Sequence, residues 1–394
     1  MSRRLFVLSI PLSAMVIFGM VAFTVKGPKA DDSGERRFTK AIPAQGAVKA
    51  PADSEAAGAR PTGSRAVAKV QILKPVAAAD GEPLAAIPTL EELFEDLEIE
   101  INVQKIELGR RLFHDTRLSS DDSLSCASCH DLRYGGIDRA TSATGVNGQI
   151  GPINTPTVFN AVFGISQFWD GRAASLENQA DGPPNAKGEM ASNWKQILAK
   201  LGADGRMLDA FKTAYPEVKS ATDLKAEHAL SAIADFERTL ITPGSRFDEY
   251  LDGDLKAITA EEYTGYKLFK DIGCVQCHYG ASVGSKAFQP LGAKKQYFTT
   301  DAHFSEVDLG RFNVTKSERD RFVFKVPSLR NIDLTGPYFH DGSKKSLDDA
   351  VRAMAFYQLD KDLSDDETRL IVAFLKTLTG DWSGKPLDEH QNRK

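Results

Sequence analysis

The sequence predicts a mainly α-helical protein in which two tandem modules with long loops follow an apolar N-terminal helix and a disordered linker. The pattern Cys-x-x-Cys-His occurs twice and uses all four cysteines of the chain. Similar stretches precede the two copies, "GRRLF" (109–113) and "GYKLF" (265–269), and similar stretches follow them, "IADFERTL" (233–240) and "IVAFLKTL" (371–378). Apolar residues recur at helical spacing in both closing stretches, and strand patterns are weak throughout. Each module therefore runs from a helix through the cysteine motif and a loop-rich middle to a closing helix.

The composition is that of an ordinary globular protein, with 42% hydrophobic and 26% charged residues. At 394 residues the chain is long enough for two or more domains. The net charge of −5 provides no basic excess to neutralise phosphates, which argues against nucleic acid as a partner. A small basic protein partner remains compatible with this charge.

The N-terminus begins with Arg3 and Arg4, followed by an uncharged stretch at 5–25. Such a stretch can cross a bilayer as a helix, with the arginines on the cytoplasmic side. A cleaved signal peptide is the alternative, although its apolar core is usually shorter and ends at a small-x-small site. We therefore assign 1–25 to a membrane anchor or a signal segment. Both interpretations send the rest of the chain across the membrane.

The stretch 26–87 is rich in alanine and proline, and Phe38 is its only aromatic residue. It cannot bury enough apolar surface to offset the entropy lost on ordering, which predicts a flexible linker. The rest of the chain divides into domains at 88–250 and 251–394, with the boundary near "TPGSRFDEYLDGD" (242–254).

The two cysteine motifs place Cys126 and Cys129 before one histidine and Cys274 and Cys277 before another. A dithiol redox motif needs a thioredoxin-like βαβ context, which is missing. A structural zinc site could use four cysteines, and a disulfide is conceivable outside the cytosol, although a two-residue spacer strains it. The remaining interpretation is covalent attachment of haem, in which the following histidine ligates the iron.

Two copies of the pentapeptide use all four cysteines, which favours covalent haem over a chance match. Both copies lie in an exported chain, and each follows a similar helix. We therefore expect two c-type haems, with His130 and His278 as the proximal ligands. The modules are then two tandem cytochrome c-like domains.

Two longer stretches carry a family resemblance, "TPTVFNAVFGISQFWDGRAASLENQADGPPNAKGEM" (155–190) and "VPSLRNIDLTGPYFHDGSKKSLDDAVRAM" (326–354). They resemble the middle and the C-terminal haem pocket of bacterial dihaem cytochrome c peroxidases, a superfamily that includes MauG-like enzymes. The similarity extends from about residue 100 to residue 380. It implies a low-potential N-terminal haem that reacts with peroxide and a high-potential C-terminal haem that collects electrons.

The resemblance also implies individual roles. Met354 matches the axial methionine of the C-terminal haem, and thioether ligation raises the potential. Trp169 matches the tryptophan between the haems, while Gln179 and Glu189 match the distal glutamine and the catalytic glutamate. A glutamate with a raised pKa can take a proton from one peroxide oxygen and deliver it to the other. Without the resemblance, Met354 would be a core residue and Glu189 a surface charge.

The family further binds calcium between its domains, and Asn154, Thr335 and Pro337 occupy the matching positions. An amide oxygen and backbone carbonyls suit this hard cation, although the same residues are common in turns. A homodimer is also implied by the resemblance, and no residue of the sequence indicates it independently.

The sequence departs from the family in one loop. Many members close the oxidised peroxidatic haem with a second histidine there, but 131–156 contains none, and Val146 lies at the matching position. Either this haem is permanently open or another residue ligates it, for which His114 and His303 are the candidates. His340 matches a family residue of the domain interface and is not an expected iron ligand.

Together these features predict a periplasmic dihaem cytochrome c peroxidase, tethered to the inner membrane or soluble after signal cleavage. It would reduce hydrogen peroxide with electrons from a small cytochrome c or cupredoxin. The alternatives are a MauG-like oxidase of a protein substrate and an electron-transfer dihaem cytochrome without peroxidase activity. In the MauG-like oxidase a tyrosine replaces the axial methionine, so Met354 argues against it.

Overall fold

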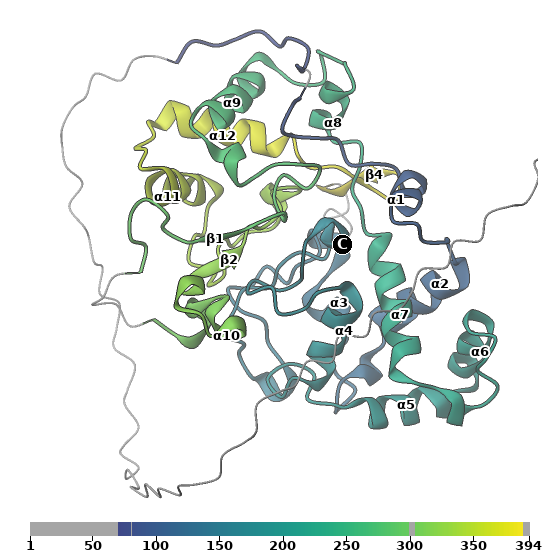
Figure 1. Ribbon diagram of the computed structural model, residues 1–394. Helices are drawn as coiled ribbons and strands as arrows, with labels where there is room; N and C mark the ends of the chain where they lie inside the picture. Colours follow the sequence, from purple (N-terminus) through teal and green to yellow (C-terminus); the bar gives the residue numbers. More distant parts are fainter. Residues whose placement is uncertain (1–69, 80, 299–303, 389–394) are drawn as a thin grey trace, which may run out of the picture. The chain divides into compact units, whose positions relative to one another are not determined.

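The computed structural model describes residues 70–79, 81–298 and 304–388, all of which belong to one compact unit of the chain (Figure 1). This part is mainly helical, with two small antiparallel pairs of strands, β1 with β2 and β3 with β4. The helices are α1 (Leu90–Asp96), α2 (Val103–Phe113), α3 (Cys126–Cys129), α4 (Leu176–Asn185), α5 (Trp194–Ala203), α6 (Gly205–Ala214), α7 (Ala226–Arg238), α8 (Arg246–Leu251), α9 (Ala260–Asp271), α10 (Phe312–Thr315), α11 (Leu347–Leu359) and α12 (Asp365–Lys376). The strands are β1 (Phe288–Pro290), β2 (Val323–Lys325), β3 (Asp381–Trp382) and β4 (Lys385–Pro386).

The predicted repeat is present as two helix pairs, α2 with α7 and α9 with α12, which lie side by side (Figure 1). A glycine permits the close approach in each pair. A Cβ added to Gly109 would lie 1.8 Å from the carbonyl oxygen of Ala232, and one added to Gly265 would lie 1.8 Å from that of Leu370. Because any larger side chain would force the helices apart, the glycines of "GRRLF" and "GYKLF" set the same crossing in both halves.

The closing helix α12 shows why these segments are helical. The hydroxyl of Ser364 accepts a hydrogen bond from the backbone N–H of Glu367, whose side chain accepts from the backbone N–H of Ser364. This capping box satisfies N–H groups at the helix start, and the acidic first turn complements the helix dipole. Beyond the cap, Ile371 and Phe374 are buried at helical spacing against α9.

An extended N-terminal strap (70–79 and 81–88) packs on the C-terminal half (251–388). Leu84 is 2% exposed within the core of that half. The backbone N–H of Gly280 donates to the carbonyl oxygen of Pro83 at 2.8 Å. The predicted flexible linker, 26–87, therefore extends too far, because its last part is held by contacts with residues far away in the sequence.

The β3–β4 hairpin, near the C-terminus, packs onto the N-terminal half (88–250), whereas the strap packs onto the C-terminal half. Leu387 is fully buried in a cluster that contains Phe113 and Phe236. Trp382 makes an edge-to-face contact with Phe159, with 5.5 Å between the ring centroids. The core of the C-terminal half thus includes a segment that precedes the N-terminal half, and the core of the N-terminal half includes the last described segment of the C-terminal half.

Across the described ranges, no helix has the length and apolarity needed to cross a bilayer. The predicted anchor or signal segment at 1–25 lies outside these ranges, as do most of the predicted linker and His303.

Candidate functional site

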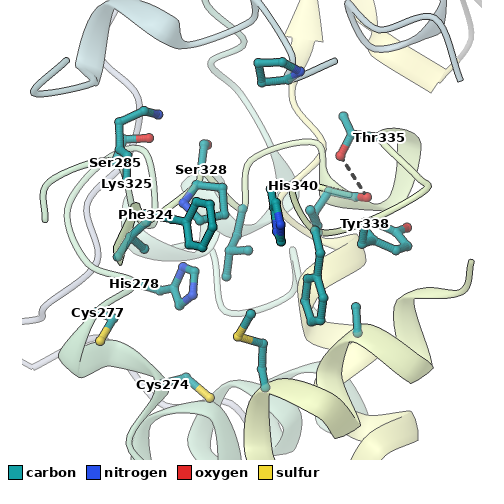
Figure 2. Close-up of a pocket in the computed structure, with 18 of the residues that line it drawn as sticks. Cys274, Cys277, His278, Ser285, Phe324, Lys325, Ser328, Thr335, Tyr338 and His340 are labelled. Carbon is teal, nitrogen blue, oxygen red and sulfur yellow. Dashed lines mark hydrogen bonds between the residues drawn. The ribbon is translucent and has the colours of Figure 1, made fainter. Parts of the chain in front are cut away.

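The C-terminal half contains a cavity into which the second cysteine motif projects (Figure 2). Its lining includes Cys274, Cys277 and His278, and Met354 from α11. The Nδ1 atom of His278 donates to the carbonyl oxygen of Val283 at 3.3 Å, which leaves Nε2 for a ligand. Burial lowers the pKa of His278 to about 4, so the imidazole is neutral, as metal ligation requires.

The N-terminal half repeats this arrangement around α3. Cys126 and Cys129 are the first and last residues of the helix, and His130 follows directly. The Nδ1 atom of His130 donates to the carbonyl oxygen of Gly136 at 3.1 Å, and burial lowers the pKa of this imidazole too. Both histidines therefore present a neutral ring whose orientation is fixed by a backbone carbonyl.

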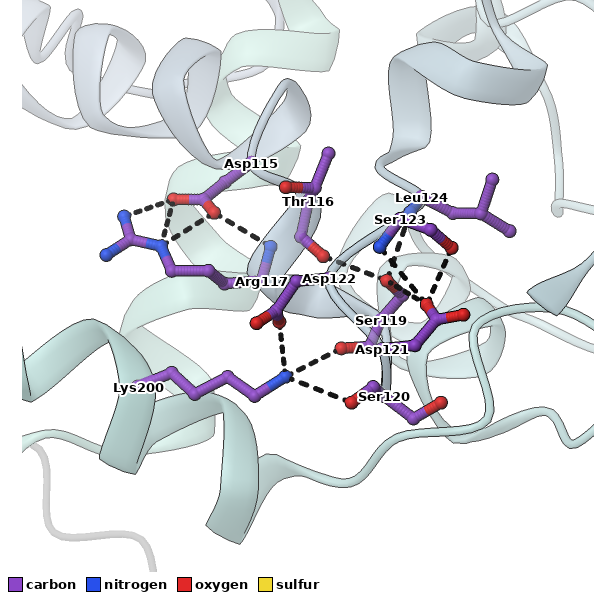
Figure 3. Close-up of polar contacts among 10 residues, drawn as sticks. All are labelled: Asp115, Thr116, Arg117, Ser119, Ser120, Asp121, Asp122, Ser123, Leu124 and Lys200. Atoms are coloured by element: carbon purple, nitrogen blue, oxygen red, sulfur yellow. Dashed lines mark hydrogen bonds and ion pairs between the residues drawn. The ribbon is translucent and has the colours of Figure 1, made fainter. Parts of the chain in front are cut away.

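A polar network fixes the segment between α2 and the first cysteine motif (Figure 3). Ser119 is fully buried, and its hydroxyl donates to the carbonyl oxygen of Thr116 and accepts from the N–H of Leu124. The ammonium group of Lys200 on α5 donates to the carbonyl oxygen of Ser119 at 2.8 Å and pairs with Asp122 at 2.5 Å. This network holds the longer spacer that distinguishes the first motif from the second.

The pairing and protonation of the four cysteines bear on the chemistries that the sequence left open. All four are unpaired thiols, and in the described part of the chain no three His, Cys, Asp or Glu side chains cluster as a metal site. Burial raises the pKa of Cys274 to about 12 and that of Cys129 to about 11, so the free thiols are neutral near pH 7. Neutral thiols beside a neutral histidine fit covalent haem, as does the largely apolar lining of the C-terminal cavity.

The segment after α4 carries the predicted proton-transfer residue. Gln179 lies on α4, and Glu189 follows the helix, with its N–H donating to the carbonyl oxygen of Ala186 at 3.0 Å. Glu189 is exposed by its surface area, yet partial burial raises the pKa of its carboxyl group, opposed by the charge of Arg172. A raised pKa suits a carboxyl group that must accept and release protons.

Trp169 connects the two halves. Its indole N–H donates to the carbonyl oxygen of Asn154 at 2.9 Å, and its own carbonyl oxygen accepts from the N–H of Lys325 on β2 at 2.8 Å. The indole lines the C-terminal cavity and makes an edge contact with His340, with 6.5 Å between the centroids. Trp169 therefore lies between the C-terminal cavity and the N-terminal half.

The residues predicted to bind calcium line the same cavity as Trp169: Asn154, Thr335 and Pro337. The side-chain nitrogen of Asn154 donates to the carbonyl oxygen of Ala140 at 3.0 Å, which fixes the orientation of the amide. These residues offer oxygen donors of the type that calcium prefers.

His340 and His114 have structural contacts. His340 is 2% exposed and pairs with Asp308 at 2.7 Å, while its carbonyl oxygen accepts from the N–H of Asn154, so it joins the halves. His114 ends α2, and its Nδ1 atom donates to the carbonyl oxygen of Arg110 at 2.9 Å.

Comparison with known proteins identifies the family. The family model of the di-haem cytochrome c peroxidases matches residues 103–256. Cytochrome c551 peroxidase of Nitrosomonas europaea is 46% identical over 280 residues, which cover 71% of this chain and 81% of the relative. This chain belongs to the dihaem cytochrome c peroxidase family. As a member, it is an oxidoreductase that acts on hydrogen peroxide and carries two c-type haems.

Two further matches show how far the similarity to other peroxidases extends. Cytochrome c peroxidase Ccp of Escherichia coli is 48% identical over 303 residues, which cover 76% of this chain but only 61% of that longer relative. A solved structure of a MauG-like protein associated with microbial copper homeostasis is 26% identical, with a TM-score of 0.64. That match covers 77% of this chain and 95% of the other.

One residue of this dihaem peroxidase was not singled out from its sequence. Glu237 on α7 is 4% exposed, although a helical glutamate is ordinarily a surface residue. The signal was present in the repeat, because "IADFERTL" places Glu237 where "IVAFLKTL" has Leu375.

Proposed function

We propose that this protein is a periplasmic peroxidase that reduces hydrogen peroxide to two molecules of water. The reaction consumes two electrons and two protons, and the electrons come from a small cytochrome c or cupredoxin. The observation that carries the proposal is the pairing of His278 with Met354 in one cavity beside Trp169. A histidine and a thioether suit a high-potential haem that accepts electrons, and the indole lies toward the other half.

The residues divide the work between the halves. His278 and Met354 would hold the iron of a haem attached to Cys274 and Cys277, and this haem would receive electrons from the donor. Cys126, Cys129 and His130 would hold the second haem, and Trp169 would lie on the route to it. When bound, the haem irons supply the electron transfer and the binding place for peroxide.

Side chains of the protein carry out the proton transfer. Glu189 accepts a proton from one peroxide oxygen and returns it to the other, which leaves as water. Gln179 on α4 orients the peroxide by hydrogen bonding. The raised pKa of the Glu189 carboxyl group, which burial causes, supports this role because it lies closer to neutral pH than that of a free carboxyl group.

Several features of the whole molecule belong to the same proposal. The halves are two tandem cytochrome c-like domains (88–250 and 251–394), which the repeated helix crossing supports. A calcium ion binds Asn154, Thr335 and Pro337 and stabilises the contact between the domains. Residues 1–25 tether the protein to the inner membrane, or are removed as a signal, and the protein forms a homodimer.

Peroxide-dependent oxidation of a reduced cytochrome c or cupredoxin by the purified dihaem protein tests the function. We expect turnover with at least one of these small donors. If neither donor is oxidised while both haems are intact, the protein is an electron-transfer cytochrome or an oxidase of a protein substrate.

A further inference from the structure

The matching helix crossings allow the two halves to be aligned residue by residue. Gly109 packs on the carbonyl oxygen of Ala232 as Gly265 packs on that of Leu370. The phenylalanine four residues later, Phe236 in one half and Phe374 in the other, lies 2.9 Å and 3.1 Å from the added Cβ atoms. The next residue in each helix must therefore occupy the same place, which equates Glu237 with Leu375.

Leu375 lines the C-terminal cavity together with Cys274 and His278. By the alignment, Glu237 faces the haem site of the N-terminal half. A second observation agrees, because burial raises the pKa of the Cys126 thiol and the charge of Glu237 adds to this increase. The carboxyl group thus lies close to a haem attachment residue, in a position where the other half has a hydrocarbon side chain.

In the described part of the chain, no cation forms an ion pair with Glu237. Arg238, next to it on α7, pairs with Glu177 on α4 and with Asp235 at 2.7 Å. The positive charge of Lys105 on α2 opposes the increase that burial causes in the pKa of Asp235. The 3₁₀ turn packed against α7 (Ala161–Phe163) contains no charged residue.

Two groups act on this region from other segments. The negative charge of Glu177 repels the carboxylate of Glu237. The charge of Glu189, like that of Glu237, adds to the increase that burial causes in the pKa of the Cys126 thiol. Burial first, and then this repulsion by Glu177, raises the pKa of Glu237 to about 8, while Arg238 opposes the increase. Small changes in nearby charge can therefore protonate or deprotonate the group near neutral pH.

We propose that Glu237 is a redox-linked proton site of the N-terminal haem, taking up one proton when that haem is reduced and releasing it on oxidation. Reduction removes one positive charge beside the carboxylate, which disfavours the anion in a buried setting. One electron arrives from the small donor by way of the C-terminal haem, and one proton arrives from solvent, so charge is balanced. The proposal rests on the haem positions of the proposed function.

The potential of each haem as a function of pH tests the site, measured by spectroelectrochemical titration without peroxide. In the wild-type dihaem protein we expect the N-terminal haem potential to fall by about 59 mV per pH unit over part of the range, the value for one proton per electron. Glu237→Gln should abolish this slope and leave the C-terminal haem unchanged. Glu237→Leu introduces the residue type found at the matching position, Leu375, and should also abolish the slope.

Glu227→Gln on the same helix is the matched control, since Glu227 is exposed and the charge change is identical. It should keep the wild-type slope. An unchanged slope in both Glu237 variants, or a wild-type potential independent of pH, would overturn the proposal. This titration does not measure turnover. A protein that failed to reduce peroxide could therefore still show the pH-dependent potential, so the proton-site proposal and the peroxidase proposal can fail independently.

Discussion

The backbone N–H of Val146 donates a hydrogen bond to the carbonyl oxygen of Glu189 at 2.8 Å. Val146 is 1% exposed, and the neighbouring Gly145 packs so closely that an added Cβ would lie 2.1 Å from the carbonyl oxygen of Gly188. The loop in which the family resemblance places a closing histidine therefore contacts the backbone of Glu189 in this protein. The proposed proton-transfer residue, Glu189, is therefore positioned by the backbone of a loop that contains no histidine.

Gly145→Ala tests this support. The φ angle of Gly145 is −85°, which alanine adopts readily, so the methyl group acts only through its collision with the backbone. We expect displacement of the Glu189 segment and a fall in peroxide turnover of about 100-fold, with haem content unchanged. Gly188→Ala is the control, since an added Cβ there meets nothing within 4 Å. Equal turnover in the two variants would contradict the positioning role.

Glu189→Gln keeps the shape of the side chain and removes the proton transfer. Steady-state peroxide turnover should fall by about 100-fold or more, while spectra of both haems stay unchanged. The wild-type rate should also fall as the pH drops through the raised pKa of this carboxyl group, because only the deprotonated form accepts a proton. Glu227→Gln should keep wild-type turnover. Near wild-type turnover in Glu189→Gln would remove the residue from the mechanism.

The helices could be predicted, and the haem-binding residues could be proposed, because their signals are local. A cap such as Ser364, helical spacing in α12 and the Cys-x-x-Cys-His pattern are all read within a few residues. The strap could not be predicted, because its alanine-rich and proline-rich sequence lacks periodicity and its contacts are with residues far away in the sequence. The burial of Glu237 and the Val146–Glu189 hydrogen bond are also non-local. They depend on how α7 and the loop pack against other segments.

Met354→His tests the assignment of the electron-accepting haem. Replacing a thioether by imidazole stabilises ferric iron, so the potential of the C-terminal haem should fall, as spectroelectrochemistry would show. Met207→Leu, a core substitution on α6, is the control and should leave both potentials unchanged. If neither potential moved in Met354→His, the methionine would be a core residue.

Arg330→Met tests how the strap and the C-terminal half are joined. The side chain of Arg330 is fully buried, pairs with Asp248 at 2.7 Å and donates to the carbonyl oxygen of Ala85 at 2.8 Å. Removing the guanidinium group leaves the Asp248 charge buried and uncompensated, which should lower the free energy of unfolding by about 3–5 kcal/mol. Denaturant titration followed by circular dichroism measures this loss.

The exposed pair Arg369–Glu261 provides the comparison for Arg330. Arg369→Met should change the free energy of unfolding by less than about 1 kcal/mol, because water screens surface ion pairs. Similar losses in the two arginine variants would show that burial does not strengthen the Arg330 contacts.

Stopped-flow mixing of the fully oxidised protein with hydrogen peroxide tests most directly the claim that peroxide reacts at an open N-terminal haem beside Glu189. A loop without a ligand has no differential affinity for oxidised iron, so no closed state accumulates. We expect the absorption spectrum of the haem to change on mixing, without prior reduction of its partner, and one haem to be high-spin or water-bound beforehand. The claim would be contradicted if both haems were low-spin and their absorption spectra did not change with peroxide until one electron was added.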